Sequence, residues 1–194
     1  MARTYAYSAD FDKDIENLFK DAKLLGEGHN GIVYEVPGNK AIKIFTDKNV
    51  CKSEAEILYR VKKSKYFPKI YKNGDYYILR DMVNGERLDD YIQENGLSQQ
   101  LIYNLYRLIN EFKSLKFTKL DARCRDIYVN KNQRLKVIDP KQCYKRKVDY
   151  PRHLMKGLDG IDVLEEFLRG IYIIDKRRGA EWEEKINQYY AREY

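Results

Sequence analysis

Three glycines and a lysine near the N-terminus are the first residues whose spacing suggests chemistry. Gly26, Gly28 and Gly31 follow the pattern G-x-G-x-x-G, and Lys43 lies in a short apolar run downstream. Glycine carries no side chain, so the backbone N–H groups of such a loop can approach phosphate oxygens closely. A dinucleotide-binding turn would need a helix that starts at the third glycine, whereas residues 32–36 alternate like a β-strand. The pattern therefore predicts a hairpin that covers a polyphosphate.

Alternating and helical periodicities predict the elements that would position these residues. An antiparallel sheet with one main helix is expected in the first part of the chain, which closes near Met82. In chain order, the predicted elements are a short helix capped by Asp10 or Asp12, strands over 22–27, 31–36 and 40–46, a helix over 50–64, and strands over 69–72 and 75–80.

The second part of the chain has mainly helical periodicity. Helices are predicted to start near residue 87 and to span 98–115, followed by a polar loop over 118–126. Short strands are expected at 127–129 and 135–138, and Asp139 stands at the exit of the second one. The tail contains two apolar stripes that predict two helices: Ile161, Leu164, Phe167, Leu168 and Ile171 in one, and Trp182, Ile186 and Tyr189 in the other.

Length and composition favour one domain or two small lobes. The chain has 194 residues, of which 43% are hydrophobic and 35% are charged. No apolar run approaches the roughly 18 residues that a membrane span requires, so no membrane contact is expected. The N-terminal residues lack the apolar core of a secretory signal, and a cytoplasmic location is expected.

Charge and cysteine patterns argue against a nucleic-acid groove, a disulfide framework and a zinc site. The net charge is +7, but Lys and Arg are spread along the whole chain, which favours a solvated surface over a nucleic-acid groove. Cys51, Cys124 and Cys143 are odd in number and widely spaced. Neither a disulfide framework nor a zinc site is therefore expected.

The glycine loop, the lysine and the later carboxylates resemble the protein-kinase-like superfamily, in a minimal bacterial form similar to the RIO and KEOPS-associated kinases. The resemblance covers about residues 22–141. It implies an α+β, two-lobed protein-kinase-like fold with an antiparallel-sheet N-lobe and a shortened helical C-lobe. Residues 1–194 would form a single kinase-like domain, with an N-lobe and its N-terminal helix over 1–82 and a truncated C-lobe over 83–194.

The resemblance implies that the chain binds ATP through its first lobe. Lys43 would contact the α and β phosphates and pair with Glu54, for which Glu56 is the alternative. His29 and Asn30, at the tip of the loop, would lie nearest the γ-phosphate. The implied nucleotide-binding residues are Gly26, Gly28, His29, Asn30, Gly31, Val33, Ala41, Lys43, Glu54, Asp81 and Val83.

The resemblance also implies catalytic and metal-binding residues in the second lobe. Asp121 would accept the proton of the substrate hydroxyl, and Arg123 would meet the transferred phosphate. Asp126 and Asp139 would bind Mg²⁺, with Mn²⁺ as an alternative. Three departures from the family pattern stand out: Lys119 replaces a histidine, Asp126 replaces an asparagine, and Pro140-Lys141 replaces Phe-Gly.

These features imply transfer of the γ-phosphate of ATP to Ser or Thr hydroxyls of a protein, including autophosphorylation. Two alternatives stay open: a pseudokinase that binds nucleotide or a partner without turnover, and a small-molecule kinase of the aminoglycoside or sugar type. A kinase-like nucleic-acid binder ranks last. Because few residues follow Asp139, a protein substrate or partner is expected to complete the short lobe, with the two tail helices and the basic segments 141–147 and 176–178 as candidate docking surfaces.

Overall fold

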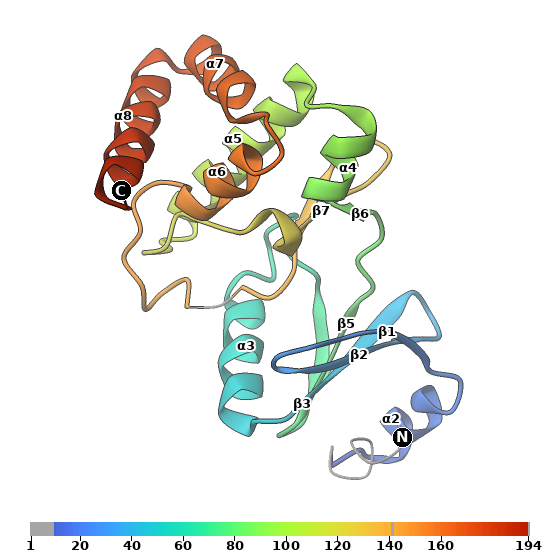
Figure 1. The fold of residues 1–194 in the computed structure, drawn as a ribbon. Helices are drawn as coiled ribbons and strands as arrows, with labels where there is room; N and C mark the ends of the chain where they lie inside the picture. Colours follow the sequence, from blue (N-terminus) through green and yellow to red (C-terminus); the bar gives the residue numbers. More distant parts are fainter. Residues whose placement is uncertain (1–9, 141, 194) are drawn as a thin grey trace. The chain divides into compact units, whose positions relative to one another are not determined.

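The structure is a computed structural model that describes residues 10–140 and 142–193. The chain divides into two compact units, the first ending at Val83 and the second beginning at Asn84 (Figure 1). Each unit is described separately.

From residue 10 onward, the first unit is an antiparallel five-stranded sheet with two helices. The strand order is β1-β2-β3-β5-β4, and every neighbouring pair is antiparallel. The elements are α2 (Lys13–Phe19), β1 (Lys23–Gly28), β2 (Gly31–Val36), β3 (Lys40–Phe45), α3 (Lys48–Arg60), β4 (Ile70–Asn73) and β5 (Tyr77–Asp81).

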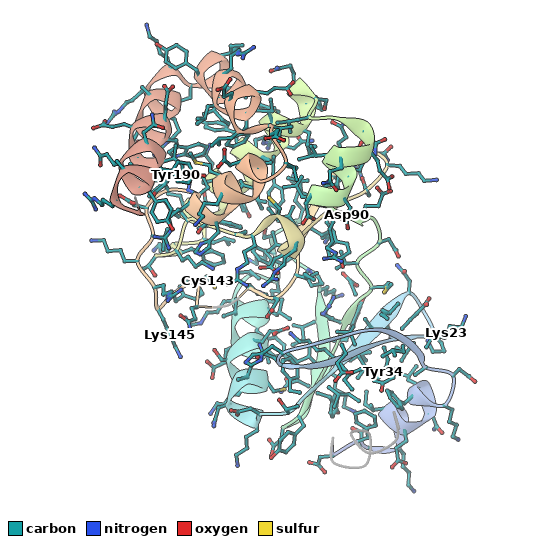
Figure 2. All side chains as sticks on the ribbon, in the orientation of Figure 1. Lys23, Tyr34, Asp90, Cys143, Lys145 and Tyr190 are labelled. Carbon is teal, nitrogen blue, oxygen red and sulfur yellow. The ribbon has the colours of Figure 1, made fainter. Side chains whose placement is uncertain are left out.

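The two faces of this sheet are covered by different helices. On one face, Tyr34, which is labelled in Figure 2, and Ile42 belong to a buried apolar cluster that includes Ile15 of α2. Because side chains alternate along a strand, Lys43 and Arg80 point to the opposite face, where α3 packs against β3, β4 and β5. The alternation therefore carries Lys43 to the side of the sheet that faces α3.

The second unit is mainly helical. A small antiparallel sheet has the strand order β6-β7-β8. Its elements are β6 (Glu86–Arg87), α4 (Leu88–Asn95), α5 (Gln99–Ser114), the 3₁₀ turn η1 (Cys124–Asp126), β7 (Ile127–Val129), β8 (Leu135–Val137), α6 (Arg152–Asp159), α7 (Leu164–Ile174) and α8 (Lys176–Glu193).

Helix α5 forms the centre of the second unit, since Leu101, Leu105 and Leu108 are fully buried along it. Helix α7 packs against α5 and α8, and Phe167 stacks on Trp182 with 6.1 Å between ring centroids. Within residues 10–140 and 142–193, no helix combines the length and the apolar character needed to cross a membrane.

The predicted α+β class, with an antiparallel N-terminal sheet and a helical C-terminal part, is confirmed. The two predicted tail helices are present as α7 and α8, but the structure has a further helix before them, α6, that was not predicted. Helix α6 has only eight residues, begins directly after Pro151 and contains Gly157, which lowers its intrinsic helix propensity. Helix α6 is stabilised by packing, because Leu154, Met155 and Leu158 are buried against the rest of the unit.

Candidate active site

The predicted glycine loop is a β-hairpin in which the three glycines have different surroundings. Gly28 and Gly31 are paired across the hairpin, and His29 and Asn30 form the turn between them. Gly31 has φ +145°, and a Cβ there would lie 1.8 Å from the carbonyl oxygen of Ile44. Gly31 is therefore required by the close approach of β3.

The other two glycines have no such structural requirement. A Cβ on Gly26 would meet no atom within 4 Å, and one on Gly28 would meet only the carbonyl oxygen of Gly31, at 4.0 Å. Strand β1 is exposed along its whole length. The backbone at Gly26 and Gly28 is thus bare where a side chain would fit, which is what close approach of a ligand needs.

Lys43 and Glu54 form a buried ion pair in the first unit. Lys43 Nζ lies 2.6 Å from Glu54 Oε2, and the two side chains are 9% and 5% exposed. Glu54, which the sequence analysis preferred, makes the pair, and the alternative, Glu56, is exposed. Since each charge is removed from water, each depends on the other for compensation.

The remaining residues predicted to bind the nucleotide lie on β2, on β3 and just after β5. Val33 is half-buried, whereas Ala41 and Val83 are buried. Their nucleotide-binding roles remain predictions.

Asp81 ends β5 and has a structural task. Its carboxylate accepts hydrogen bonds from the Lys69 backbone N–H at 2.9 Å and from the Tyr71 hydroxyl at 2.6 Å. The hydrogen bond to this carboxylate raises the pKa of Tyr71. The Asp81 side chain therefore ties β4 to β5.

Asp121, the predicted proton acceptor, caps helix α6 in the second unit. Its carboxylate is fully buried and accepts hydrogen bonds from the backbone N–H groups of His153, at 3.0 Å, and Leu154, at 3.3 Å. These are among the first N–H groups of α6, which have no partner within the helix. The predicted catalytic carboxylate is thus also the group that holds α6 in place.

His153 is a site residue that the sequence analysis missed. Its ring Nδ1 lies 2.5 Å from Asp121 Oδ2, and its side chain is 29% exposed. A neutral imidazole in this position donates its Nδ1–H to the carboxylate, which leaves Nε2 as a proton acceptor. The only sequence signal is the placement of His153 at the start of a helix, and that helix was not predicted.

Asp126 and Asp139, the predicted metal ligands, are brought together by the backbone. Asp126 ends η1, and its carbonyl oxygen accepts a hydrogen bond of 2.8 Å from the N–H of Ile138, the neighbour of Asp139. Asp139 has φ +57°, so the chain turns there into the left-handed region. Both residues are half-buried.

The donor set fits magnesium only if a substrate completes it. Among the described residues, no group of three or more His, Cys, Asp or Glu side chains is placed to hold a metal ion. Two carboxylates supplemented by phosphate oxygens and water form the usual Mg²⁺ site at a nucleotide. Asp126 and Asp139 supply hard oxygen ligands of this kind.

Other residues of the second unit that the sequence analysis singled out lie at η1 or shortly after β8 in the chain. Arg123 directly precedes η1 and is exposed, and Pro140 is buried. Lys141 lies outside the described residues. Cys124, inside η1, is buried, and this burial raises its thiol pKa to about 12, which makes it unreactive near neutral pH.

Comparison with known proteins gives a distant similarity to a curated protein. No family model matches the chain. The chain is 24% identical over 147 residues to a protein of Bacillus subtilis (strain 168) named "Putative serine/threonine-protein kinase YrzF". The match covers 72% of this chain and 68% of that protein. Together with the antiparallel sheet and the helical second unit, this similarity supports a kinase-like protein.

Proposed function

We propose that this protein is an ATP-dependent kinase that transfers the γ-phosphate to a Ser or Thr hydroxyl of a protein, including its own. The observation that carries the proposal is the buried Lys43–Glu54 ion pair on the sheet that also bears the glycine hairpin. The similarity to a protein named as a serine/threonine kinase supports the same reaction class. The proposal includes a relation to the RIO and KEOPS-associated kinases and a cytoplasmic location.

In the proposed mechanism, the first unit binds the triphosphate. Backbone N–H groups at Gly26 and Gly28 approach the phosphates, and Lys43, oriented by Glu54, contacts the α and β phosphates. Asp126 and Asp139 would hold Mg²⁺, or Mn²⁺, which neutralises phosphate charge when it is bound.

The second unit would remove the proton of the acceptor. The hydroxyl oxygen bonds to the γ-phosphorus, the bond between that phosphorus and the bridging oxygen to the β-phosphate breaks, and ADP leaves with the bond electrons. We assign the hydroxyl proton to the Asp121–His153 pair, in which the partly exposed ring of His153 would accept the proton and buried Asp121 would stabilise the charged ring.

The test is transfer of labelled γ-phosphate in Mg²⁺ or Mn²⁺, comparing wild type with Asp139→Asn, Asp121→Asn and His153→Gln. Loss of a metal ligand or of proton acceptance is expected to lower the rate by about 100-fold or more. Equal background transfer by wild type and Asp139→Asn would refute the proposal. A normal rate for His153→Gln beside an inactive Asp121→Asn would return proton acceptance to Asp121 alone.

One observation favours a second candidate, a pseudokinase that binds nucleotide without turnover. The Asp121 carboxylate is fully buried and already caps α6, whereas a direct proton acceptor must reach the substrate. The pseudokinase predicts metal-dependent nucleotide binding that Lys43→Ala abolishes, with no phosphate transfer or release. Any Asp121-dependent turnover would exclude it.

A further inference from the structure

A cationic hollow lies in the second unit beside the predicted catalytic loop. Its volume is about 330 Å³, and residues of α4, η1, α6 and α8 line it. Among its described lining residues are four permanent cations, Arg123, Arg125, Arg152 and Lys156, and a single carboxylate, Asp89. Like charges gathered in a concave site favour an anionic ligand.

Two of these cations are held in place by one aromatic ring. Arg152 and Lys156 are one helical turn apart on α6, a spacing at which like charges repel. The Arg152 guanidinium lies 5.0 Å and Lys156 Nζ 4.8 Å from the ring centroid of Tyr189 on α8. Lys156 Nζ also donates a hydrogen bond of 2.9 Å to the Tyr189 hydroxyl. The ring therefore fixes two cations together although they repel each other.

Two polar atoms among the lining residues of this hollow make no hydrogen bond within the described part of the chain. These atoms are Arg152 Nε and Asp89 Oδ1, and both are buried. Buried polar atoms normally have partners, and unsatisfied ones at a hollow point to a ligand that supplies them. Arg152 Nε is a donor and Asp89 Oδ1 is an acceptor. A ligand that serves both should therefore carry an anionic group for the arginine and a hydroxyl group for the aspartate.

The wall between η1 and α6 is built for close contact. A Cβ on Gly157 would lie 2.5 Å from Cys124 Sγ, so glycine allows α6 to pack directly on η1. The Cys124 thiol in turn donates to the carbonyl oxygen of Leu154 at 3.5 Å. This packing brings Arg152 and Lys156 to the same hollow as Arg123 and Arg125.

We propose that this hollow binds a phosphorylated polyol of the sugar phosphate class, with its phosphate at Arg152 and Lys156 and a hydroxyl group toward Asp89. The volume lies at the lower end of the range for small-molecule sites. Binding itself does not depend on the kinase proposal. The further role of the bound polyol as phosphate acceptor rests on that proposal, and is suggested by Arg123 and His153, which line the same hollow.

The experiment is calorimetric titration of the full chain without nucleotide or divalent metal, using glucose 6-phosphate, glucose, inorganic phosphate and a phosphoserine peptide. Glucose 6-phosphate is expected to bind more tightly than the other three. Arg152→Gln and Lys156→Gln should each weaken its binding by about tenfold, since each removes a charge-assisted contact to phosphate. Arg169→Gln removes an equal charge from an exposed position on α7 and should leave binding within about twofold.

Several outcomes would overturn the proposal. They are no binding of glucose 6-phosphate by folded wild type, tighter binding of the peptide, or equal weakening by Arg169→Gln. Thermal unfolding of each variant shows whether it is folded. If Arg152→Gln does not fold, Lys156→Gln alone tests the phosphate site. Because the titration contains neither nucleotide nor divalent metal, a failed kinase assay and a failed titration are separate results.

Discussion

The two units each bury a carboxylate that the sequence predicts to be functional, but they compensate it differently. In the first unit, Glu54 is paired with the Lys43 ammonium, a charged side chain on a strand. In the second unit, Asp121 is held by backbone N–H groups at the start of α6 and by His153. One carboxylate positions a cation, and the other positions a helix and a histidine.

The difference separates two ways in which a buried acid can serve a site. An ion pair fails when either partner is removed, because the remaining charge is left buried. A helix cap fails only when the acid is removed, since the N–H groups remain whatever side chain faces them. Replacing both partners should therefore restore stability in the first unit and not in the second.

The largest expected effect is in the first unit. Lys43→Met should lower the free energy of unfolding by about 3–5 kcal/mol, because Glu54 is left buried without its cation. Lys43→Met/Glu54→Met should return to within about 1 kcal/mol of wild type in urea unfolding, since an apolar pair replaces the ion pair. A single variant as stable as wild type would show that the pair is not held in a desolvated site.

The glycine hairpin offers the next largest effect. Gly31→Ala should lower stability by about 3 kcal/mol, because its Cβ collides with the Ile44 carbonyl and its φ of +145° is unfavourable for alanine. Gly28→Ala is the matched control and should change stability by less than about 0.5 kcal/mol. If the backbone at Gly28 contacts the phosphates of ATP, Gly28→Ala should also weaken ATP binding in a nucleotide titration. A destabilised Gly28→Ala would mean that both glycines are structural.

A smaller loss is expected in the second unit. Asp121→Ala should reduce stability by about 2 kcal/mol in urea unfolding, through the loss of the α6 cap. Asp121→Ala/His153→Ala should not recover this loss, in contrast to the double variant of the first unit. Recovery would show that the histidine, rather than the helix, is what Asp121 compensates, and the contrast between the units would disappear.

The smallest effect concerns a second helix cap, at the start of α8. Asp175 accepts hydrogen bonds from the Arg178 N–H at 3.0 Å and the Tyr106 hydroxyl at 2.8 Å, which lower its pKa below the ordinary 3.8. Asp175→Ala should lower the free energy of unfolding by about 1 kcal/mol at neutral pH.

The contribution of Asp175 should depend on pH. A carboxylate whose pKa is lower in the folded state stabilises the protein at pH values above its unfolded-state pKa, and this stabilisation is lost as the pH falls through its folded-state pKa. The difference in melting temperature between wild type and variant should therefore be constant from pH 5 to 7 and shrink below pH 3.8. A constant difference down to pH 2 would contradict the role of the charged carboxylate.

Most of the first unit was predictable because its signals are local. Alternation over residues 31–36 places a strand with the bounds that the structure has, and the strand at 40–45 follows with Lys43 on the face opposite Ile42. The helix predicted over 50–64 starts earlier, since the Asp47 side chain accepts a hydrogen bond from the Asn49 N–H and caps it. The sequence already favoured Glu54 over Glu56, and the packing of α3 on the sheet buries Glu54 beside Lys43.

The second unit was less predictable because its site depends on contacts between distant parts of the chain. Asp121 and His153 are 32 residues apart in the chain. Helix α6, which carries His153 and is capped by Asp121, has too few residues for a clear periodic pattern. Likewise, the cationic hollow combines residues from α4, η1, α6 and α8, which no spacing along the chain relates.

The sequence by itself determined the class of fold, the bare glycine hairpin and the order of the lysine and carboxylates, since strand alternation and glycine content act within a few residues. Only the tertiary structure decided what each carboxylate does. Burial against α3 gives Glu54 a cation as partner, while the packing of α6 on η1, allowed by Gly157, gives Asp121 a helix to cap and a histidine to orient. The cost of leaving a buried polar group unpaired makes these partners obligatory, and they come from segments that meet only in the folded chain.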